Sequence, residues 1–160
     1  MSTGWNAYRT KGTIPQADKI RKLGLLIVDD EQGIVESLRE VFGGTFEIQH
    51  STSATEALEL FKEHTPKLVI SDQRMPGMTG LELLRRVKEI QPSTISILVT
   101  GYSDINIVVE ALNEGLLWKY VAKPWDHDKL RELVLQGARK YIKDAGLDEK
   151  AYGMQGFFGA

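Results

Sequence analysis

The chain has 160 residues, 42% of them apolar, and a formal net charge of −2. The length and the apolar content suit one folded domain. The slightly negative net charge argues against direct binding of nucleic acid. The absence of cysteine excludes disulfides, thiolate zinc sites and cysteine nucleophiles. No apolar run approaches the roughly 20 residues that span a bilayer, and residues 1–22 lack the apolar core of a secretory signal, so we expect a cytoplasmic protein without membrane contact.

The first elements after residue 22 alternate between strand and helix. Apolar runs predict strands over residues 23–28 and 46–50, and an amphipathic stripe predicts a helix over residues 32–42 between them. Ser53 and Glu56 have the spacing of a capping box, which predicts where the second helix starts.

The third strand has the most informative end. An apolar run over residues 68–71 is followed by Asp72 and then by a turn that contains proline and glycine. Such a run indicates a strand buried on both faces, as in a parallel sheet, and it places Asp72 at the edge where open α/β sheets bind ligands. A helix over about residues 81–90 follows, and then a fourth strand over residues 95–100 that ends on Thr100.

The remaining elements continue this alternation. A helix is expected between Asp104, whose side chain is placed to cap it, and Gly115. Its inward stripe is predicted to comprise Ile105, Val108, Val109 and Leu112. A fifth strand over residues 116–121 precedes Lys123, and Asp126 is expected to cap a last helix.

Strands that alternate with amphipathic helices predict an α/β fold with a parallel sheet and right-handed crossovers. We expect a doubly wound (βα)5 flavodoxin-like three-layer sandwich with strand order 2-1-3-4-5. The domain is predicted to cover residues 23–143, between an N-terminal arm over residues 1–22 and a C-terminal tail over residues 144–160.

Acidic, hydroxyl and amino side chains follow the carboxyl ends of four strands. They are Asp29, Asp30, Asp72, Thr100 and Lys123. Because neighbouring strands lie about 4.8 Å apart, all five are expected on one rim of the sheet. Three carboxylates so close repel one another, and a hard divalent cation, Mg²⁺ or Mn²⁺, relieves the repulsion. We expect direct coordination by Asp30, Asp72 and the backbone carbonyl of Arg74, and coordination by Asp29 through water.

The same residues indicate phosphoryl-transfer chemistry. The carboxylate of Asp72 can attack phosphorus and form an aspartyl phosphate. Phosphoryl transfer needs mainly positioning and neutralisation of charge, which the cation and the ammonium of Lys123 would supply. The hydroxyl of Thr100 can donate a hydrogen bond to a phosphoryl oxygen.

Four sequence pieces occur in order on the predicted rim. They are Val28-Asp29-Asp30, the run from Ser71 to Gly80, Val99-Thr100-Gly101 and the run from Tyr120 to Trp125. With these pieces the chain resembles the receiver domain of two-component response regulators, over about residues 23–143. The motifs Asp-Gln-Arg-Met-Pro-Gly and Lys-Pro-Trp-Asp are similar to the corresponding sequences in receivers of hydrogenase-type transcription regulators and of cyclic-di-GMP phosphodiesterase regulators.

This resemblance implies a role for each matching residue. Asp72 would be the phosphoacceptor and Lys123 the phosphate-binding lysine. Thr100 and Tyr120 would form the switch pair. The bond between Lys123 and Pro124 would be cis.

The resemblance also implies partners. A sensor histidine kinase or a phosphotransfer protein would donate the phosphoryl group, and the face of the fourth helix, fifth strand and fifth helix would control an output domain or partner protein, or form a homodimer. The protein would be a signalling receiver that catalyses only its own phosphorylation and dephosphorylation, not an enzyme. Arg74 and Tyr102, two positions beyond Asp72 and Thr100, are expected to tune water access and dephosphorylation.

Three other functions stay open at this point. An aspartate-nucleophile phosphatase usually has a second aspartate two residues after the nucleophile, where this chain has Arg74. A pseudo-receiver would use the fold as a binding module without phosphorylation, and the complete set of acids, threonine and lysine argues against it. A nucleotide-binding flavodoxin-like protein would need a glycine-rich cradle, but the turn after the first strand is Asp29-Asp30-Glu31-Gln32.

Overall fold

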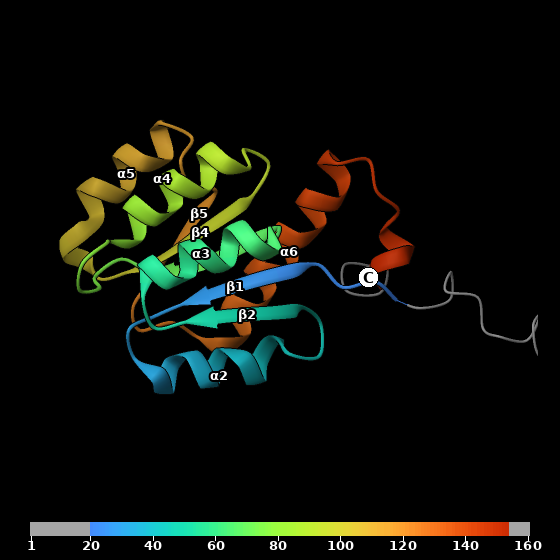
Figure 1. The fold of residues 1–160 in the computed structure, drawn as a ribbon, viewed down its shortest axis with the longest axis horizontal. Helices are drawn as coiled ribbons and strands as arrows, with labels where there is room; N and C mark the ends of the chain where they lie inside the picture. The colour runs from blue at the N-terminus through green and yellow to red at the C-terminus, as the bar shows by residue number, and fades with distance from the viewer. Residues whose placement is uncertain (1–19, 154–160) are drawn as a thin grey trace, which may run out of the picture.

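The computed structural model describes residues 20–153, which form the predicted doubly wound fold (Figure 1). The strands are β1 Gly24–Val28, β2 Glu47–Ser51, β3 Leu68–Asp72, β4 Ile95–Thr100 and β5 Lys119–Ala122. They form a parallel sheet in the order β2-β1-β3-β4-β5, which confirms the predicted order. The α-helices are α2 Gln32–Phe42, α3 Ala54–His64, α4 Gly80–Ile90, α5 Ile105–Asn113 and α6 His127–Asp144. The described part of the chain also contains the short 3₁₀ helices η2 Tyr102–Asp104 and η3 Glu149–Tyr152.

The helices cover both faces of the sheet (Figure 1). Helices α2 and α6 pack on one face, and α3, α4 and α5 pack on the other. Strand residues alternate between the two cores, as the pleat requires: Leu25 and Ile27 belong to the first, whereas Leu26 and Val28 belong to the second. Every residue of β3 is buried, so Asp72 stands at the end of a strand that is covered on both sides.

The starts of three helices follow from the local sequence. Ser53 caps α3 by accepting a hydrogen bond from the backbone N–H of Glu56 at 3.4 Å. A complete capping box occurs at α4, where the Thr79 hydroxyl accepts from the Glu82 N–H and the Glu82 carboxylate accepts from the Thr79 N–H. The carboxylate of Asp126 accepts from two backbone N–H groups of α6, as predicted.

Strand β5 starts later than predicted, at Lys119 rather than at residue 116. Gly115 ends the preceding helical segment with a φ of 72°, and the N–H of Leu116 still donates to the carbonyl oxygen of Ala111. Leu116 and Leu117 are buried in the core beneath α3, α4 and α5. These two residues are apolar because the loop that contains them is buried, and they do not belong to the strand.

The predicted inward stripe of α5 is wrong in two positions. Val108 is fully buried, but Ile105 and Val109 are 37% and 47% exposed. Ala111 occupies the buried side instead. The stripe was ambiguous because apolar residues lie on more than one side of this helix, and periodicity alone does not show which side faces the sheet.

The segment after α6 folds back onto the start of β1. The backbone N–H of Arg21 donates to the carbonyl oxygen of Ala151 at 2.7 Å, and Arg139 forms an ion pair with Glu149 at 3.0 Å. Tyr152 packs against the core beneath α2 and α6. The described part of the predicted tail thus has structure of its own, whereas residues 1–19 of the arm and 154–160 of the tail lie outside the described residues. Between residues 20 and 153, no helix has the length and apolar content needed to cross a bilayer.

Candidate functional site

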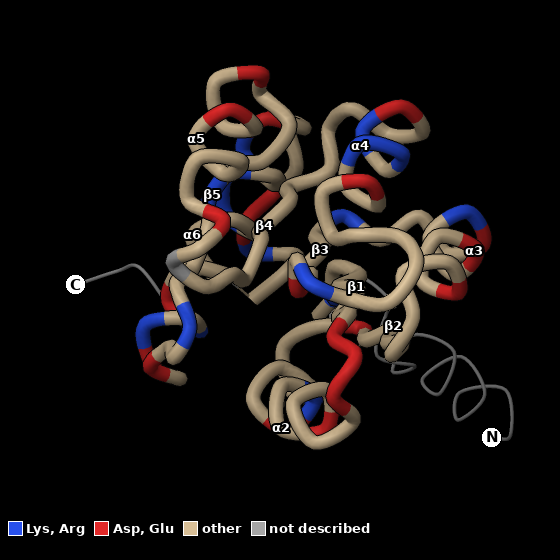
Figure 2. Tube along the Cα trace, turned by 90° about the vertical axis from the view of Figure 1, so that its left-hand side faces the viewer, with Lys and Arg blue, Asp and Glu red and all other residues tan. Residues whose placement is uncertain are grey.

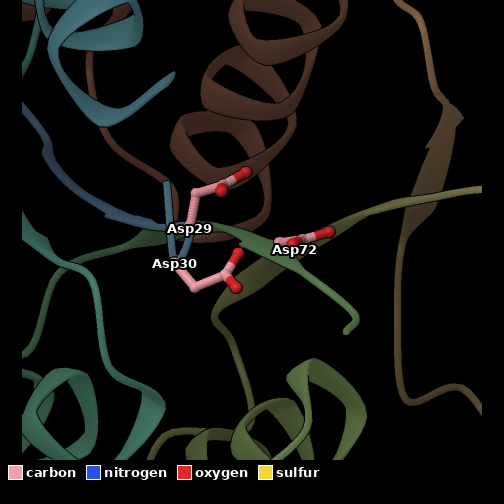
Figure 3. A group of neighbouring side chains, drawn as sticks. All are labelled: Asp29, Asp30 and Asp72. Atoms are coloured by element: carbon pink, nitrogen blue, oxygen red, sulfur yellow. The ribbon is translucent and has the colours of Figure 1, made fainter. Parts of the chain in front are cut away.

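Three carboxylates meet at the carboxyl edge of the sheet (Figure 3). Strands β1 and β3 lie side by side in the sheet (Figure 2). Val28 pairs with Ser71 in their register, so the residues that follow these two strand positions lie beside each other. Asp29, Asp30 and Asp72 each offer a carboxylate oxygen within 4.8 Å of the others. Asp29 and Asp72 are buried and Asp30 is exposed. The structure thus brings together the three acids that the sequence places on one rim.

The ammonium of Lys123 lies among these carboxylates. Its Nζ is 2.9 Å from Oδ1 of Asp72 and 3.9 Å from Oδ2 of Asp29. The backbone N–H of Lys123 donates to the carbonyl oxygen of Thr100 at 2.9 Å, which fixes the loop after β5 against the end of β4. The bond from Lys123 to Pro124 is cis, as the resemblance implies.

Burial and charge shift the pKa values of these groups. Burial, the largest effect, raises the pKa of Asp29 to about 6, although a hydrogen bond from the Glu31 N–H opposes it; the charge of Asp72 raises this pKa further, and Lys123 lowers it. Burial likewise raises the pKa of Asp72, against its hydrogen bond with Lys123. Burial by itself would lower the pKa of Lys123, but the hydrogen bond and the charge of Asp72 outweigh burial and raise it.

The rim carries an excess of negative charge. The Lys123 ammonium lies near the carboxylates of Asp72 and Asp29, and the carboxylate of Asp30 joins the same group. Burial, with a smaller contribution from neighbouring carboxylates, makes both buried acids bind protons more readily than they would in water. Carboxylate oxygens are the ligands that Mg²⁺ and Mn²⁺ prefer. The donor set therefore fits a hard divalent cation.

The loop after β3 holds Asp72 in place. The backbone N–H of Gln73 donates to Oδ1 of Asp72 at 2.9 Å, and the side-chain carbonyl of Gln73 accepts from the N–H of Leu81 in α4 at 2.9 Å. Gly80 approaches the backbone carbonyl of Asp72 so closely that a Cβ would collide with it. Sequence reasoning missed both Gln73 and Gly80, because neither has an ionisable or nucleophilic side chain. In the sequence, only the position of Gln73 directly after Asp72 points to the site, whereas the fold brings Gly80 close to Asp72.

A second polar network joins Thr100 to the loop after β3. The Thr100 hydroxyl donates to Oδ2 of Asp104 at 3.2 Å. From the other loop, the guanidinium of Arg74 donates to both carboxylate oxygens of Asp104, at 3.0 and 3.1 Å. The hydrogen bond from Arg74 holds the pKa of Asp104 below its usual value, and the same bond raises the pKa of Arg74.

The expected role of Asp104 as a side-chain cap is wrong. Asp104 is the N-cap residue of α5, but its side chain makes no cap hydrogen bond, because its carboxylate is engaged by Thr100 and Arg74. An acidic residue just before a helix normally caps that helix. The sequence therefore does not indicate that the Asp104 carboxylate binds Thr100 and Arg74 instead.

A profile of the response regulator receiver domain matches residues 25–135. The chain belongs to this family. The match includes Asp29, Asp30, Asp72, Thr100 and Lys123. The resemblance seen in the sequence is thereby confirmed.

Relatives of this receiver include transcriptional regulatory proteins and a sporulation phosphotransferase. The hydrogenase transcriptional regulatory protein HoxA of Bradyrhizobium diazoefficiens is 35% identical over 79% of this chain and 27% of its own length. Sporulation initiation phosphotransferase F of Bacillus subtilis is 34% identical over 74% of this chain and 92% of its own length. A solved receiver domain protein from Methanospirillum hungatei superposes with a TM-score of 0.73 and 28% identity, over 78% of this chain and 99% of that one. The chain spans about a quarter of the length of the HoxA proteins.

The remaining residues that the sequence predicted for the site are Tyr120, Tyr102 and Arg74. Tyr120 of β5 is 39% exposed, so its ring is not packed in the core. The side chain of Tyr102 lies outside the part of the chain that the structure describes. Coordination of a cation by the backbone carbonyl of Arg74 stays a prediction.

Proposed function

We propose that this receiver accepts a phosphoryl group on the carboxylate of Asp72, from a phosphohistidine of a sensor histidine kinase or of a phosphotransfer protein. The contact of 2.9 Å between Lys123 Nζ and Asp72 Oδ1 carries the proposal. This contact orients the carboxylate of Asp72 and places a positive charge beside it. Phosphoryl transfer requires both positioning of the nucleophile and neutralisation of charge. Membership of the receiver family supports the same class of reaction.

In the proposed transfer, an oxygen of Asp72 forms a bond to phosphorus while the bond from phosphorus to the donor's imidazole nitrogen breaks. The nitrogen keeps the electron pair of that bond and, after taking up a proton, leaves as neutral imidazole. Lys123 remains beside the new acyl phosphate and neutralises part of its charge. Hydrolysis later returns the Asp72 carboxylate and inorganic phosphate, so the protein acts only on its own phosphorylation state.

The acidic cluster is the proposed site of Mg²⁺ or Mn²⁺. Asp30, Asp72 and the backbone carbonyl of Arg74 would be direct ligands, and Asp29 would act through water. When bound, the cation supplies charge neutralisation for the phosphoryl oxygens. The chain's own contribution is to hold the three carboxylates together despite their mutual repulsion.

Phosphorylation is proposed to change the face that α5, β5 and α6 form. The group adds about −1.5 to −2 charge at Asp72. The Thr100 hydroxyl would turn to a phosphoryl oxygen, and the Tyr120 ring, now 39% exposed, would move inward. Ile107 and Val109 of α5 are 44% and 47% exposed and would meet an output domain, a partner protein or a second copy.

Labelling with a radioactive phosphoryl donor tests the proposal. With Mg²⁺ and either acetyl phosphate or a phosphorylated histidine donor, we expect the wild type to be labelled and Asp72→Asn to stay unlabelled. Asp144→Asn, which removes an exposed carboxylate from α6, is the matched control and should label like the wild type. Retained labelling of Asp72→Asn would refute the assignment, and an unlabelled but folded wild type would favour a pseudo-receiver.

A further inference from the structure

The carboxylate of Asp104 connects two loops at the mouth of the site. Its Oδ2 accepts from the Thr100 hydroxyl at 3.2 Å and from Nε of Arg74 at 3.0 Å, and its Oδ1 accepts from Nη2 of Arg74 at 3.1 Å. The same Nη2 also donates to the hydroxyl of Ser103 at 3.1 Å. Arg74 lies two residues after Asp72, so one side of this network belongs to the loop that directly follows the reacting carboxylate.

The Thr100 hydroxyl has a single hydrogen to donate. Its nearest acceptors are Oδ2 of Asp104 at 3.2 Å and the carbonyl oxygen of Gly101 at 3.4 Å. A carboxylate is the stronger acceptor of the two because it carries a charge. Thr100 is only 3% exposed, which limits the access of water to its hydroxyl. A phosphoryl oxygen on Asp72 must therefore compete with Asp104 for this hydrogen.

We propose that Asp104 is a positioning residue that retains the Thr100 hydroxyl in the unphosphorylated protein and releases it when Asp72 is phosphorylated. The inference rests on the proposed function, because it concerns how readily the switch follows the phosphoryl group. In this view Asp104 opposes switching, and the equilibrium between the two positions of Thr100 is set by two competing acceptors.

Arg74 makes the release of Thr100 inexpensive. A buried carboxylate that loses a hydrogen bond is destabilised unless another donor remains. Asp104 is 6% exposed, but both of its oxygens keep their hydrogen bonds to Arg74 when Thr100 leaves. The guanidinium therefore satisfies Asp104 in both positions of Thr100, which keeps the exchange reversible.

The same exchange reaches α5. Asp104 is the N-cap residue of this helix, and its side chain does not satisfy the free N–H groups of the first turn in the present structure. Loss of the Thr100 hydrogen bond leaves Oδ2 with spare accepting capacity next to these groups. Asp104 thus links the phosphorylation site to the helix that presents Ile107 and Val109 on the surface.

A titration with beryllofluoride and Mg²⁺, followed by heteronuclear NMR, tests this role in the full chain. Asp104→Ala should bind beryllofluoride about tenfold more tightly than the wild type, and its free spectrum should show the Thr100 amide shifted toward the wild type's saturated position. Glu114→Gln is the matched control, because Glu114 follows the other end of α5 and pairs with Arg85. It removes the same charge and should leave both readouts unchanged.

A double-mutant cycle separates positioning from a general structural or charge effect. In a Thr100→Val background the hydroxyl is gone, so Asp104→Ala should change the beryllofluoride affinity less than twofold. An equal gain in both backgrounds, or an unchanged or weaker affinity of Asp104→Ala in the wild-type background, would overturn the inference. If Asp104→Ala does not fold, Asp104→Asn replaces it, and a smaller change in the same direction is expected. A wild type without any response to beryllofluoride would overturn the proposed function itself, which is a distinct result.

Discussion

Nζ of Lys123 lies 2.9 Å from Oδ1 of Asp72, although the strands that precede and carry these residues are separated in the sheet by β4. The lysine side chain therefore spans the end of β4, where Thr100 lies. Asp72 is almost fully buried, with a side chain that is 7% exposed. Removal of the lysine would leave a buried carboxylate without its cation, which is strongly unfavourable.

Lys123→Met should reduce both phosphorylation and stability. Loss of a preorganised charge at a reacting group typically lowers a rate about 10²-fold, and we expect this for phosphorylation by acetyl phosphate. The free energy of unfolding of the metal-free protein at pH 7 should fall by about 1–3 kcal/mol. Lys129→Met, which removes an exposed ammonium from α6, serves as the control for both measurements. Equal phosphorylation rates for Lys123→Met and the wild type would contradict the assigned role.

Asp29→Asn should stabilise the metal-free protein at neutral pH. Because burial raises the pKa of Asp29 from 3.8 to about 6, its carboxyl group contributes stability that is present below pH 3.8 and is lost as the pH rises through about 6. The difference corresponds to at most about 3 kcal/mol at pH 7.

Chemical denaturation in the presence of a chelator measures this effect. The gain from Asp29→Asn should be largest at pH 7 and should vanish toward pH 4, where the wild-type carboxyl is protonated. Glu132→Gln, an exposed change on α6, should show no such pH dependence. A destabilised Asp29→Asn at pH 7 would show that the attraction of Lys123 outweighs burial and the repulsion from Asp30 and Asp72.

Mg²⁺ should stabilise the folded protein in a way that depends on Asp30. At a concentration ten times its dissociation constant, a ligand that binds only the folded state adds about 1.4 kcal/mol. Thermal unfolding should show this shift for the wild type and a smaller shift or none for Asp30→Asn. Glu89→Gln, which removes an exposed carboxylate from α4, is the control and should show the wild-type shift. The shift should also shrink from pH 7 to pH 5, since protons then compete for Asp29. An identical Mg²⁺ effect in Asp30→Asn would place the cation elsewhere.

Gly80→Ala should destabilise the fold through a steric collision. A Cβ at this position would meet the backbone carbonyl of Asp72 and lie 2.9 Å from Cδ1 of Leu98. Such overpacking costs about 1–3 kcal/mol, and it should also slow phosphorylation because it displaces Asp72. Gly33→Ala in α2 meets nothing within 4 Å and should instead stabilise by up to about 1 kcal/mol. Urea unfolding of both variants provides the comparison, and equal stabilities would contradict the close approach.

The positions of the rim residues were predictable because all strands of a parallel sheet end at the same edge. Once an apolar run predicts a buried strand, the residue that ends or directly follows it must lie at the carboxyl edge. This holds for Asp72 and Thr100, which end β3 and β4, and for Asp29, which follows β1, whatever their contacts are. Lys123 follows by the same reasoning from β5, even though that strand begins later than predicted.

Contacts between loops were not predictable in this way. The carboxylate of Asp104 accepts a hydrogen bond from Arg74, which is 30 residues away in the sequence. No local sequence pattern predicts a hydrogen-bond partner at that separation. The exposed Ile105 and Val109 show the same limit, because the packing of α5 depends on its rotation about its own axis and not on composition. The contact between Arg21 and Ala151 uses backbone groups, which have no sequence signature.

Chemical location of the phosphoryl group decides whether Asp72 is the phosphoacceptor. After incubation with a phosphorylated histidine donor and Mg²⁺, borohydride reduction converts an aspartyl phosphate to homoserine, and peptide mass spectrometry identifies the modified position. We predict homoserine at position 72 in the wild type and at no position in Asp72→Asn. Homoserine at another aspartate, or none at position 72 when the donor has lost its phosphoryl group to the protein, would contradict the central claim.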